Sequence, residues 1–328
     1  MNETYLVAGR RGKNAGPRYL LGVVFVLFMW FVVGGWVSVA LGSLLDAPAG
    51  QIATGSSSAG PISGYLVISA SFPVFLLGTV LAVALIHRRS PLTLVTGRRR
   101  IDWGRVGTGF VAWFALAVLG GLVGFLIYPS YYSFGPSLAA FVPFLLLALV
   151  LTPIQTTAEE VFFRGYLVQG SSLIFGNFLF LAVTSGVLFM LPHLANPGLD
   201  AAFLLVALYH FGFGTFLAWV SLRDGTLELA IGAHAANNLF GAVVLGFEGA
   251  ALNTPALFYT DRFVPAYSLI QFLVAAAFFY LAFFVLFERR PERVRSTPAP
   301  RAVGSHRSSE PFPKQQEEGG ARHDAAGD

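Results

Sequence analysis

Three charged side chains stand together inside a long apolar stretch of this sequence: Glu159, Glu160 and Arg164. Between Arg105 and Asp200 the chain has no other Asp, Glu, Lys or Arg residue. An ionisable group inside a membrane segment costs several kcal/mol unless it is paired or hydrated, so such groups mark functional sites by default. We call these three residues the charged cluster, and they are the first candidates for chemistry.

The spacing within the charged cluster indicates different roles for its members. Glu160 and Arg164 are four residues apart, so on a helix they share one face, in the order that favours an ion pair. Glu159 points about 100° away from Glu160 and has no obvious partner nearby in the sequence. A carboxylate shielded from water is suited to act as a general base, and we expect this role for Glu159. The alternative, in which all three charges are structural and Arg164 reaches the membrane surface, stays open.

Two histidines in apolar segments add to this pattern. His193 ends the sequence Phe-Met-Leu-Pro-His, and His234 begins the sequence His-Ala-Ala-Asn-Asn. On helices, Phe189 would share a face with His193, and His234 with Asn238. A lone membrane histidine is more often an interhelical hydrogen-bond partner than a catalyst. A carboxylate, two histidines and an asparagine on three segments are harder to explain by packing alone.

The composition indicates which elements position these residues. The chain has 328 residues, of which 55% are hydrophobic and 12% charged, and its mean hydropathy is +0.67. A soluble domain has about 25% charged residues, and several uncharged runs here exceed the roughly 20 residues that span a bilayer as a helix. We therefore predict an all-α, polytopic membrane helical bundle of about eight transmembrane helices. The predicted helices are Tyr19–Leu45, Gly64–Ile86, Val106–Tyr128, Leu138–Gly170, Asn177–Leu194, Ala201–Leu222, Thr226–Phe247 and Pro265–Phe287.

The distribution of basic residues predicts the orientation. Arginines and a lysine precede the first helix, lie between the second and third, and follow the last, whereas loops 46–63 and 129–137 contain none. Basic loops stay in the cytoplasm, so both termini are expected there. Residues 1–18 would form a cytoplasmic N-terminal segment, 19–287 the transmembrane domain, and 288–328 a disordered cytoplasmic tail.

Three motifs together resemble one known family. Glu-Glu-x-x-x-Arg at 159–164, Phe-x-x-x-His at 189–193 and His-x-x-x-Asn at 234–238 resemble the CPBP family. This family includes CAAX-type prenyl-protein endopeptidases and the bacteriocin-processing or immunity proteins also called Abi proteins. The resemblance covers about residues 138–247, which would form the catalytic core. It implies an intramembrane endopeptidase that cleaves membrane-associated proteins or peptides, in the plasma membrane of a prokaryote.

The resemblance also implies roles for individual residues. Glu159 would activate the hydrolytic water, with Glu160 supporting it. His193 would position that water or bind a metal, and His234 with Asn238 would stabilise the oxyanion. The further supporting side chains would be Arg164 and Phe189.

Two mechanisms use the same residues. In the first, Glu159, His193 and His234 hold a zinc ion whose bound water is the nucleophile. In the second, the reaction is independent of metal, Glu159 deprotonates water, and His234 and Asn238 donate hydrogen bonds to the oxyanion. The chain has no cysteine, so a metal site would have to use His, Asp, Glu or Asn. The sequence does not decide between the two mechanisms.

Other functions are weighed against this prediction. A non-proteolytic immunity or scaffold protein, or a proton-coupled transporter using Glu159 as proton carrier, would also place carboxylates in the membrane. The sequence shows no internal repeat typical of transporters, and it has no His-Glu-x-x-His motif. Ser185 beside a membrane histidine is better explained by helix packing than by a serine protease, and His210 by an interhelical bond. The basic clusters flank apolar runs, so the expected partners are the lipid bilayer and a membrane-associated substrate, not nucleic acid.

Overall fold

The computed structural model describes residues 4–48, 60–135, 138–194, 202–247 and 254–286. They belong to one unit, Met1–Glu292. The tail predicted for residues 288–328 lies outside the described residues.

Each predicted helix corresponds to a helical segment of the structure. Six segments are long and apolar enough to cross a membrane, and α10 is a shorter apolar helix of 16 residues. The prediction of an all-α, polytopic membrane bundle is therefore confirmed. The segments are α2–η1–α3 at Gly16–Leu44, α5–α6–η2 at Pro61–Ile86, α7 at Trp103–Ile127, α8–η5–α9 at Leu138–Ser171, α10 at Phe178–His193, α11 at Phe203–Asp224, α12 at Glu228–Leu239 followed by η6 at Phe240–Val244, and α13–η7 at Pro265–Leu286.

A small sheet corrects one predicted helix boundary. The seventh helix was expected to run to Phe247, but it ends at Val244, and Leu245–Phe247 forms strand β2. Strand β2 pairs in parallel with β3 (Phe258–Thr260), which pairs antiparallel with β1 (Tyr132–Phe134). The sequence Val-Val-Leu-Gly-Phe contains no polar residue at this boundary. The apolar pattern alone therefore does not show where the helix ends and the strand begins.

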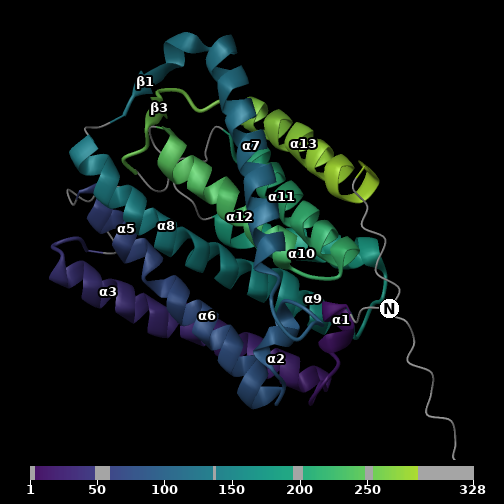
Figure 1. The fold of residues 1–328 in the computed structure, drawn as a ribbon. Helices are drawn as coiled ribbons and strands as arrows, with labels where there is room; N and C mark the ends of the chain where they lie inside the picture. The colour runs from purple at the N-terminus through teal and green to yellow at the C-terminus, as the bar shows by residue number, and fades with distance from the viewer. Residues whose placement is uncertain (1–3, 49–59, 136–137, 195–201, 248–253, 287–328) are drawn as a thin grey trace, which may run out of the picture. The chain divides into compact units, whose positions relative to one another are not determined.

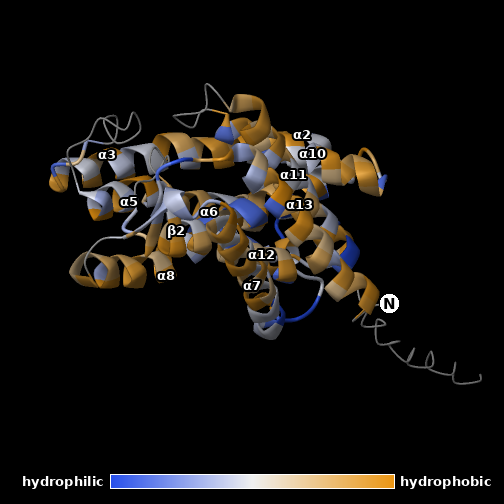
Figure 2. Cartoon of the chain, turned by 90° about the horizontal axis from the view of Figure 1, so that it is seen from above, coloured by the Kyte–Doolittle hydropathy of each residue, from blue (hydrophilic) through white to orange (hydrophobic). Residues whose placement is uncertain are grey.

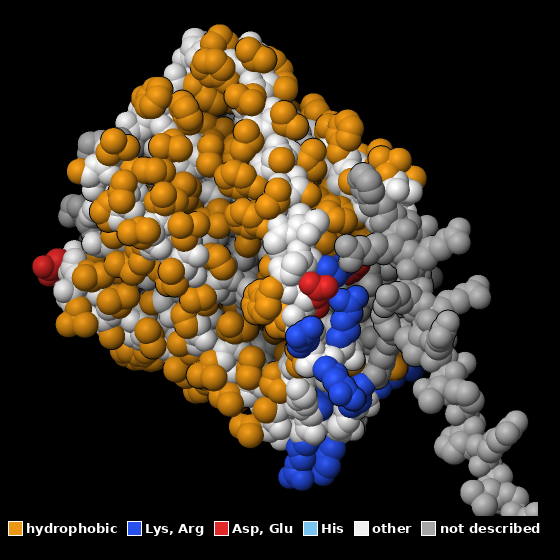
Figure 3. Space-filling view, in the orientation of Figure 1, with side chains coloured by type: hydrophobic (Ala, Val, Ile, Leu, Met, Phe, Trp, Pro, Cys, Tyr) orange, Lys and Arg blue, Asp and Glu red, His pale blue; other side chains and the backbone are white. Residues whose placement is uncertain are grey.

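The exposed surface of the described helices is apolar. Large side chains such as Trp36, Leu126 and Leu146 are 63–76% exposed, far more apolar exposure than water tolerates in one continuous area. Figure 2 shows apolar residues along most of α7 and α8, and Figure 3 shows hydrophobic side chains over most of the visible face. The chain is therefore an integral, multi-pass membrane protein.

The helix carrying the charged cluster lies inside this bundle. Helix α8 lies between α6 and α12, while α7 packs along α12 and α10 packs along α11 (Figure 1). Helix α12 can approach α7 closely because Gly232 has no side chain, and a Cβ atom there would lie 2.0 Å from the Val106 carbonyl oxygen. This packing brings α8, α10 and α12 together, the three helices on which the sequence motifs lie.

Candidate active site

The charged cluster sits where the α-helical winding of α8 changes. Glu159 and Glu160 end α8, and the next seven residues, Val161–Leu167, form the π-helical segment η5. Such segments are rare and are frequently found at functional sites. Arg164 Nη1 donates to Glu160 Oε1 at 2.8 Å, and both side chains are fully buried. The ion pair predicted from the spacing is therefore present.

Glu160 also fixes the orientation of His234. His234 Nδ1 lies 2.6 Å from Glu160 Oε1. Because an ionised carboxylate only accepts hydrogen bonds, the proton of this bond belongs to Nδ1. In the neutral ring the other nitrogen, Nε2, is then a hydrogen-bond acceptor. Nε2 lies 3.6 Å from Glu159 Oε2, so His234 bridges the two carboxylates.

Glu159 keeps one oxygen atom available. Its Oε1 accepts from Gln155 Nε2 at 3.3 Å, and its side chain is almost fully buried. Among the described residues, Oε2 has no hydrogen-bond partner. Gln155 was missed in the sequence analysis, although its position one helical turn before Glu159 could have revealed it. The available oxygen faces the acceptor nitrogen of His234.

His193 lies at the edge of this arrangement. Its Nδ1 donates to the Phe189 carbonyl oxygen at 2.7 Å, and its ring stacks on His210 with 4.2 Å between ring centroids. In the described part of the chain, no hydrogen bond joins His193 to Glu159 or His234. The stacking with His210, which the sequence did not predict, gives His193 its orientation from a second helix.

Phe189 links the buried ion pair to His234. The guanidinium carbon of Arg164 lies 4.2 Å from the centroid of the Phe189 ring, a cation–π contact. The rings of Phe189 and His234 form a T-shaped pair with 5.6 Å between their centroids. Phe189 therefore packs against both Arg164 and His234. These contacts explain the phenylalanine of the Phe-x-x-x-His motif at 189–193.

Asn238 is oriented by its neighbour Asn237. The Asn237 carbonyl oxygen accepts from Trp113 Nε1 at 3.3 Å and from the Tyr209 hydroxyl at 3.2 Å. Its amide then donates to Asn238 Oδ1 at 3.2 Å. The side-chain oxygen of Asn238 is thus engaged, and its NH₂ group is the end left to donate elsewhere. The roles of Asn237, Trp113 and Tyr209 were not predictable from the sequence, because contacts between distant helices leave no spacing signal.

A cavity of about 460 Å³ adjoins these residues. Gln155, His210, Asn237 and Asn238 line it near the charged cluster. Its opposite end lies at the small sheet, where the lining is largely aromatic. The lining residues at that end include Tyr128, Tyr131, Tyr132, Phe247, Thr260 and Arg262. A space of this volume can hold a segment of peptide beside the site.

The three side chains considered as zinc ligands do not form a ligand set. In the part of the chain that the structure describes, no three His, Asp or Glu side chains lie close enough together to hold a metal ion. Glu159 and His234 approach each other, but His193 contacts Phe189 and His210 instead. The positions of these three side chains therefore do not fit a bound zinc ion.

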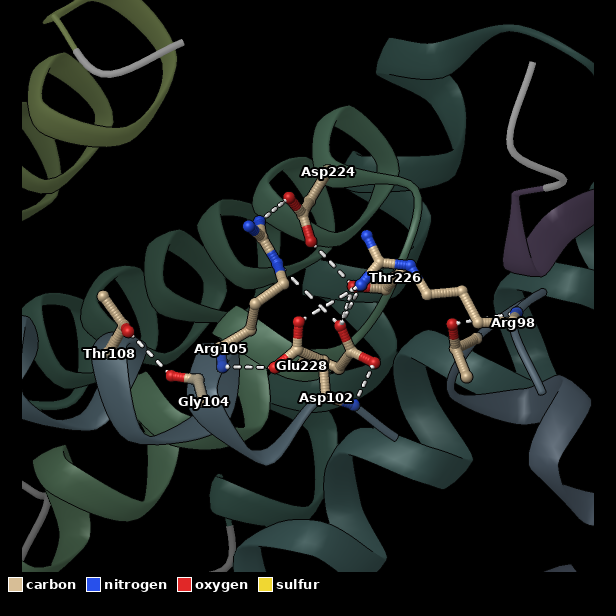
Figure 4. A network of polar contacts seen from close by, with 9 residues as sticks. Arg98, Asp102, Gly104, Arg105, Thr108, Asp224, Thr226 and Glu228 are labelled. Atoms are coloured by element: carbon tan, nitrogen blue, oxygen red, sulfur yellow. Dashed lines mark hydrogen bonds and ion pairs between the residues drawn. The ribbon is translucent and has the colours of Figure 1, made fainter. Parts of the chain in front are cut away.

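A second polar network holds the start of α12, and so sets the position of His234. Glu228, the first residue of α12, accepts from the backbone N–H of Asp102 at 2.8 Å (Figure 4). Arg105 forms an ion pair with Asp224 and lies 3.8 Å from Glu228. Between Asp224 and Glu228, Gly225 has a φ angle of +77°, which favours glycine. These contacts connect the start of α7 to the turn between α11 and α12.

The part of the chain that carries these residues is also the part that resembles a known protein family. Residues 137–240 match the family described as type II CAAX prenyl endopeptidase Rce1-like. A protein of Bacillus subtilis (strain 168), described as uncharacterized protein YyaK, is 36% identical over 187 residues. The alignment covers 56% of this chain and 62% of that protein, so the chain spans less than two thirds of its relative. No solved structure matches the chain significantly. The match includes the charged cluster, both motif histidines and Asn238, and it confirms the predicted resemblance to the CPBP family over this part of the chain.

Proposed function

We propose that this protein is an intramembrane endopeptidase that hydrolyses peptide bonds of membrane-associated proteins or peptides, in the plasma membrane of a prokaryote. The observation that carries the proposal is the pairing of Glu159 Oε2, which has no hydrogen-bond partner among the described residues, with His234 Nε2 at 3.6 Å. Two acceptors at this separation can both receive hydrogen bonds from one water molecule. The neighbouring cavity offers room for the peptide.

The reaction needs one base and one oxyanion donor. Glu159 takes a proton from the water as the water oxygen attacks the peptide carbonyl carbon. The NH₂ group of Asn238 donates to the oxyanion that forms. Glu159 then returns the proton to the departing nitrogen as the C–N bond breaks, which leaves a carboxylic acid and an amine.

His234 takes a different role from the one that the family resemblance implies. With its Nδ1–H donating to Glu160 Oε1, a neutral His234 ring accepts a hydrogen bond from the water through Nε2 and has no N–H left to donate to the oxyanion. Glu160 and Arg164 act through His234, as positioning residues. His193, fixed by Phe189 and His210, lies beside this group and completes the polar side of the site.

The test compares cleavage of a quenched library of membrane peptides by the purified wild-type protein and by Glu159→Gln. The amide cannot accept the proton, and removal of a general base typically lowers the rate by about 10²–10⁴-fold. Glu310→Gln, in the C-terminal tail, is the matched control and should cleave at the wild-type rate. Wild-type-like cleavage by Glu159→Gln would show that another group is the base.

Chelation separates the two mechanisms considered for this site. Without a zinc ion in the reaction, cleavage should persist in a chelator, and added zinc should not increase it. Loss of cleavage with chelator and its return with zinc would instead establish a metal mechanism. If the folded wild-type protein cleaves nothing under either condition, while Glu159→Gln keeps the protein's cellular role, a scaffold or immunity function replaces the peptidase.

A further inference from the structure

The side chain of Tyr5 is fully buried, although it precedes the first membrane-spanning helix. Tyr5 begins the short helix α1 (Tyr5–Ala8). Its hydroxyl group has no hydrogen-bond partner among the described residues. A buried tyrosine hydroxyl usually finds a partner, so an isolated one requires an explanation. We propose that Tyr5 is a positioning residue of the candidate active site, whose hydroxyl group holds Glu160 through one buried water molecule; the effect on cleavage rests on the proposed function.

Backbone contacts hold α1 against the helices of the site. The Tyr5 N–H donates to the Gly225 carbonyl oxygen at 2.9 Å, in the turn that leads into α12. The Tyr5 carbonyl oxygen accepts from Gln169 Nε2 at 2.8 Å, on α9 (Val168–Ser171), which continues η5 (Figure 1). Gly9 lies so close to the Gln169 side chain that an added Cβ would be 2.6 Å from it. Tyr5 is therefore fixed both to the segment that follows the charged cluster and to the turn that precedes the helix of His234.

The ion pair of the charged cluster leaves two polar atoms without a bond. Glu160 Oε1 is bonded to Arg164 Nη1 and to His234 Nδ1. Glu160 Oε2 and Arg164 Nε, in contrast, are buried and have no hydrogen-bond partner in the part of the chain that the structure describes. The cluster thus has one acceptor and one donor left for a further polar group.

The hydroxyl group of Tyr5 lies close enough to the ion pair to interact with both of its charges. Burial raises the pKa of Tyr5, the negative charge of Glu160 raises it further, and the positive charge of Arg164 has a smaller, lowering effect. The hydroxyl group therefore keeps its proton and can donate a hydrogen bond. The larger effect of Glu160 indicates that the hydroxyl group interacts mainly with the carboxylate.

One water molecule satisfies all three of these buried atoms. A buried water typically makes about three hydrogen bonds to polar groups that otherwise lack a partner. Here the water accepts from the Tyr5 hydroxyl and from Arg164 Nε, and it donates to Glu160 Oε2. This assignment agrees with the chemistry of each group, because a phenol and a guanidinium donate and an ionised carboxylate accepts.

The bridge fixes the second oxygen atom of the Glu160 carboxylate. With Oε1 bonded to His234 and Oε2 bonded through water to Tyr5, the carboxylate cannot rotate without breaking hydrogen bonds. The His234 ring then keeps its direction, and its Nε2 stays 3.6 Å from Glu159 Oε2. Tyr5 therefore acts on the reaction through Glu160 and His234 and does not touch the substrate.

The test removes the hydroxyl group and keeps the aromatic ring. Tyr5→Phe is compared with the matched control Tyr19→Phe in the purified full-length protein. The Tyr19 hydroxyl is also buried without a hydrogen-bond partner among the described residues, but the rings against which Tyr19 packs are those of His87 and Tyr166. Thermal unfolding verifies that both variants are folded, and kcat and KM are measured with a peptide that the wild-type protein cleaves.

Tyr5→Phe should lower kcat about 10-fold, since small misplacements in a site cost up to roughly 10²-fold. It should leave KM unchanged, because Tyr5 makes no contact with the bound peptide. Tyr19→Phe should keep the wild-type kcat. Equal kcat values for the two folded variants would overturn the proposal, because both substitutions remove the same atom from a buried ring.

A second measurement does not depend on peptidase activity. Nitrogen NMR of the protein with isotope-labelled histidine reports on the His234 ring, whose signals are identified by their loss in His234→Gln. These signals should shift in Tyr5→Phe and stay in place in Tyr19→Phe. Unchanged His234 signals in Tyr5→Phe would overturn the proposal even if the wild-type protein cleaves peptides. If the wild-type protein cleaves nothing, the proposed function fails, and the His234 signals alone decide whether Tyr5 holds Glu160.

Discussion

The two adjacent carboxylates of the site differ in what they contact. Glu160 is fully buried, and its Oε1 is bonded to both Arg164 and His234, whereas Glu159 Oε1 is bonded only to Gln155. Among the described residues the Oε2 atom of each has no hydrogen-bond partner, but only that of Glu159 lies near the second ring nitrogen of His234, at 3.6 Å. The contacts of Glu160 stabilise the fold and fix the orientation of the His234 ring. The contacts of Glu159 leave its Oε2 beside the His234 ring, where it can accept a hydrogen bond from water. Adjacent residues of one type thus have different surroundings because helix geometry turns their side chains in different directions.

This difference predicts that the same substitution lowers the stability of the protein at Glu160 and has little effect on it at Glu159. Glu160→Gln leaves the Arg164 charge buried without its partner, which costs about 3–5 kcal/mol. Glu159→Gln retains a carbonyl oxygen to accept from Gln155, so its stability should change by less than about 1 kcal/mol. Thermal unfolding in detergent measures both. A Glu160→Gln protein as stable as wild type would mean that the ion pair does not hold the site together.

His210 provides a second prediction at this scale. Its Nδ1 donates to the Val206 carbonyl oxygen at 2.8 Å, which fixes the ring that stacks on His193. If His210 positions His193, then His210→Ala should lower kcat about 10-fold, since small misplacements in a site cost up to roughly 10²-fold. His210→Phe keeps an aromatic ring and should recover most of that loss. Equal kcat for wild type and His210→Ala would exclude this positioning role.

Sequence spacing could predict some residues of the site but not others. Glu160 and Arg164 are one turn apart in the same helix, so their contact followed from local geometry alone. The contact of His234 with both carboxylates joins two helices and depends on how each is rotated, which spacing does not determine. The contacts of Asn237 were missed for the same reason. A motif can identify the residues of a site, but their partners depend on the packing of the helices.

At the scale of elements, contacts at both ends of α12 and its packing against α7 and α8 fix the position of this helix. The polar network around Glu228 fixes its start, and η6 leads directly into strand β2. The helical part of this segment was predictable from its apolar pattern, but the strand was not, because its pairing partner, β3, lies in another part of the chain. Hydrophobic pattern identifies an element, whereas tertiary pairing decides where it ends.

The close approach of α7 and α12 gives the prediction at this scale. In Gly232→Ala the added Cβ would meet the backbone of Val106, so the helices must separate, and we expect a loss of about 1–3 kcal/mol with reduced cleavage. Gly107→Ala, on α7, is the matched control because nothing lies within 4 Å of its added Cβ. There the better helix propensity of alanine should add up to about 1 kcal/mol. Equal effects of the two substitutions would mean that this contact does not position His234.

At the scale of the whole molecule, hydrolysis within a membrane requires a route for water. Gln155 and Asn238 lie at one end of the larger cavity, and its other end lies at the sheet, where Arg262 is exposed. The lining combines polar side chains such as Gln155 and Arg262 with many aromatic ones, which suits a peptide that is itself partly apolar. The side of the membrane from which this cavity is reached therefore determines which substrates can enter.

The orientation predicted from the basic residues can be tested cleanly because the chain has no native cysteine. Arg100→Cys and Ser133→Cys each place one thiol at an exposed position, the first before α7 and the second in β1. A membrane-impermeant maleimide should label Ser133→Cys in intact cells and Arg100→Cys only after the cells are opened, since basic connections stay in the cytoplasm.

The reverse labelling pattern would show that the bundle is inverted in the membrane. Ser133 follows Tyr132, which lines the larger cavity and pairs with Thr260 across the sheet. The expected result would therefore place the sheet end of the cavity outside the cytoplasm and the start of α7 inside it. In that orientation a peptide would reach the Glu159 site from the outer side.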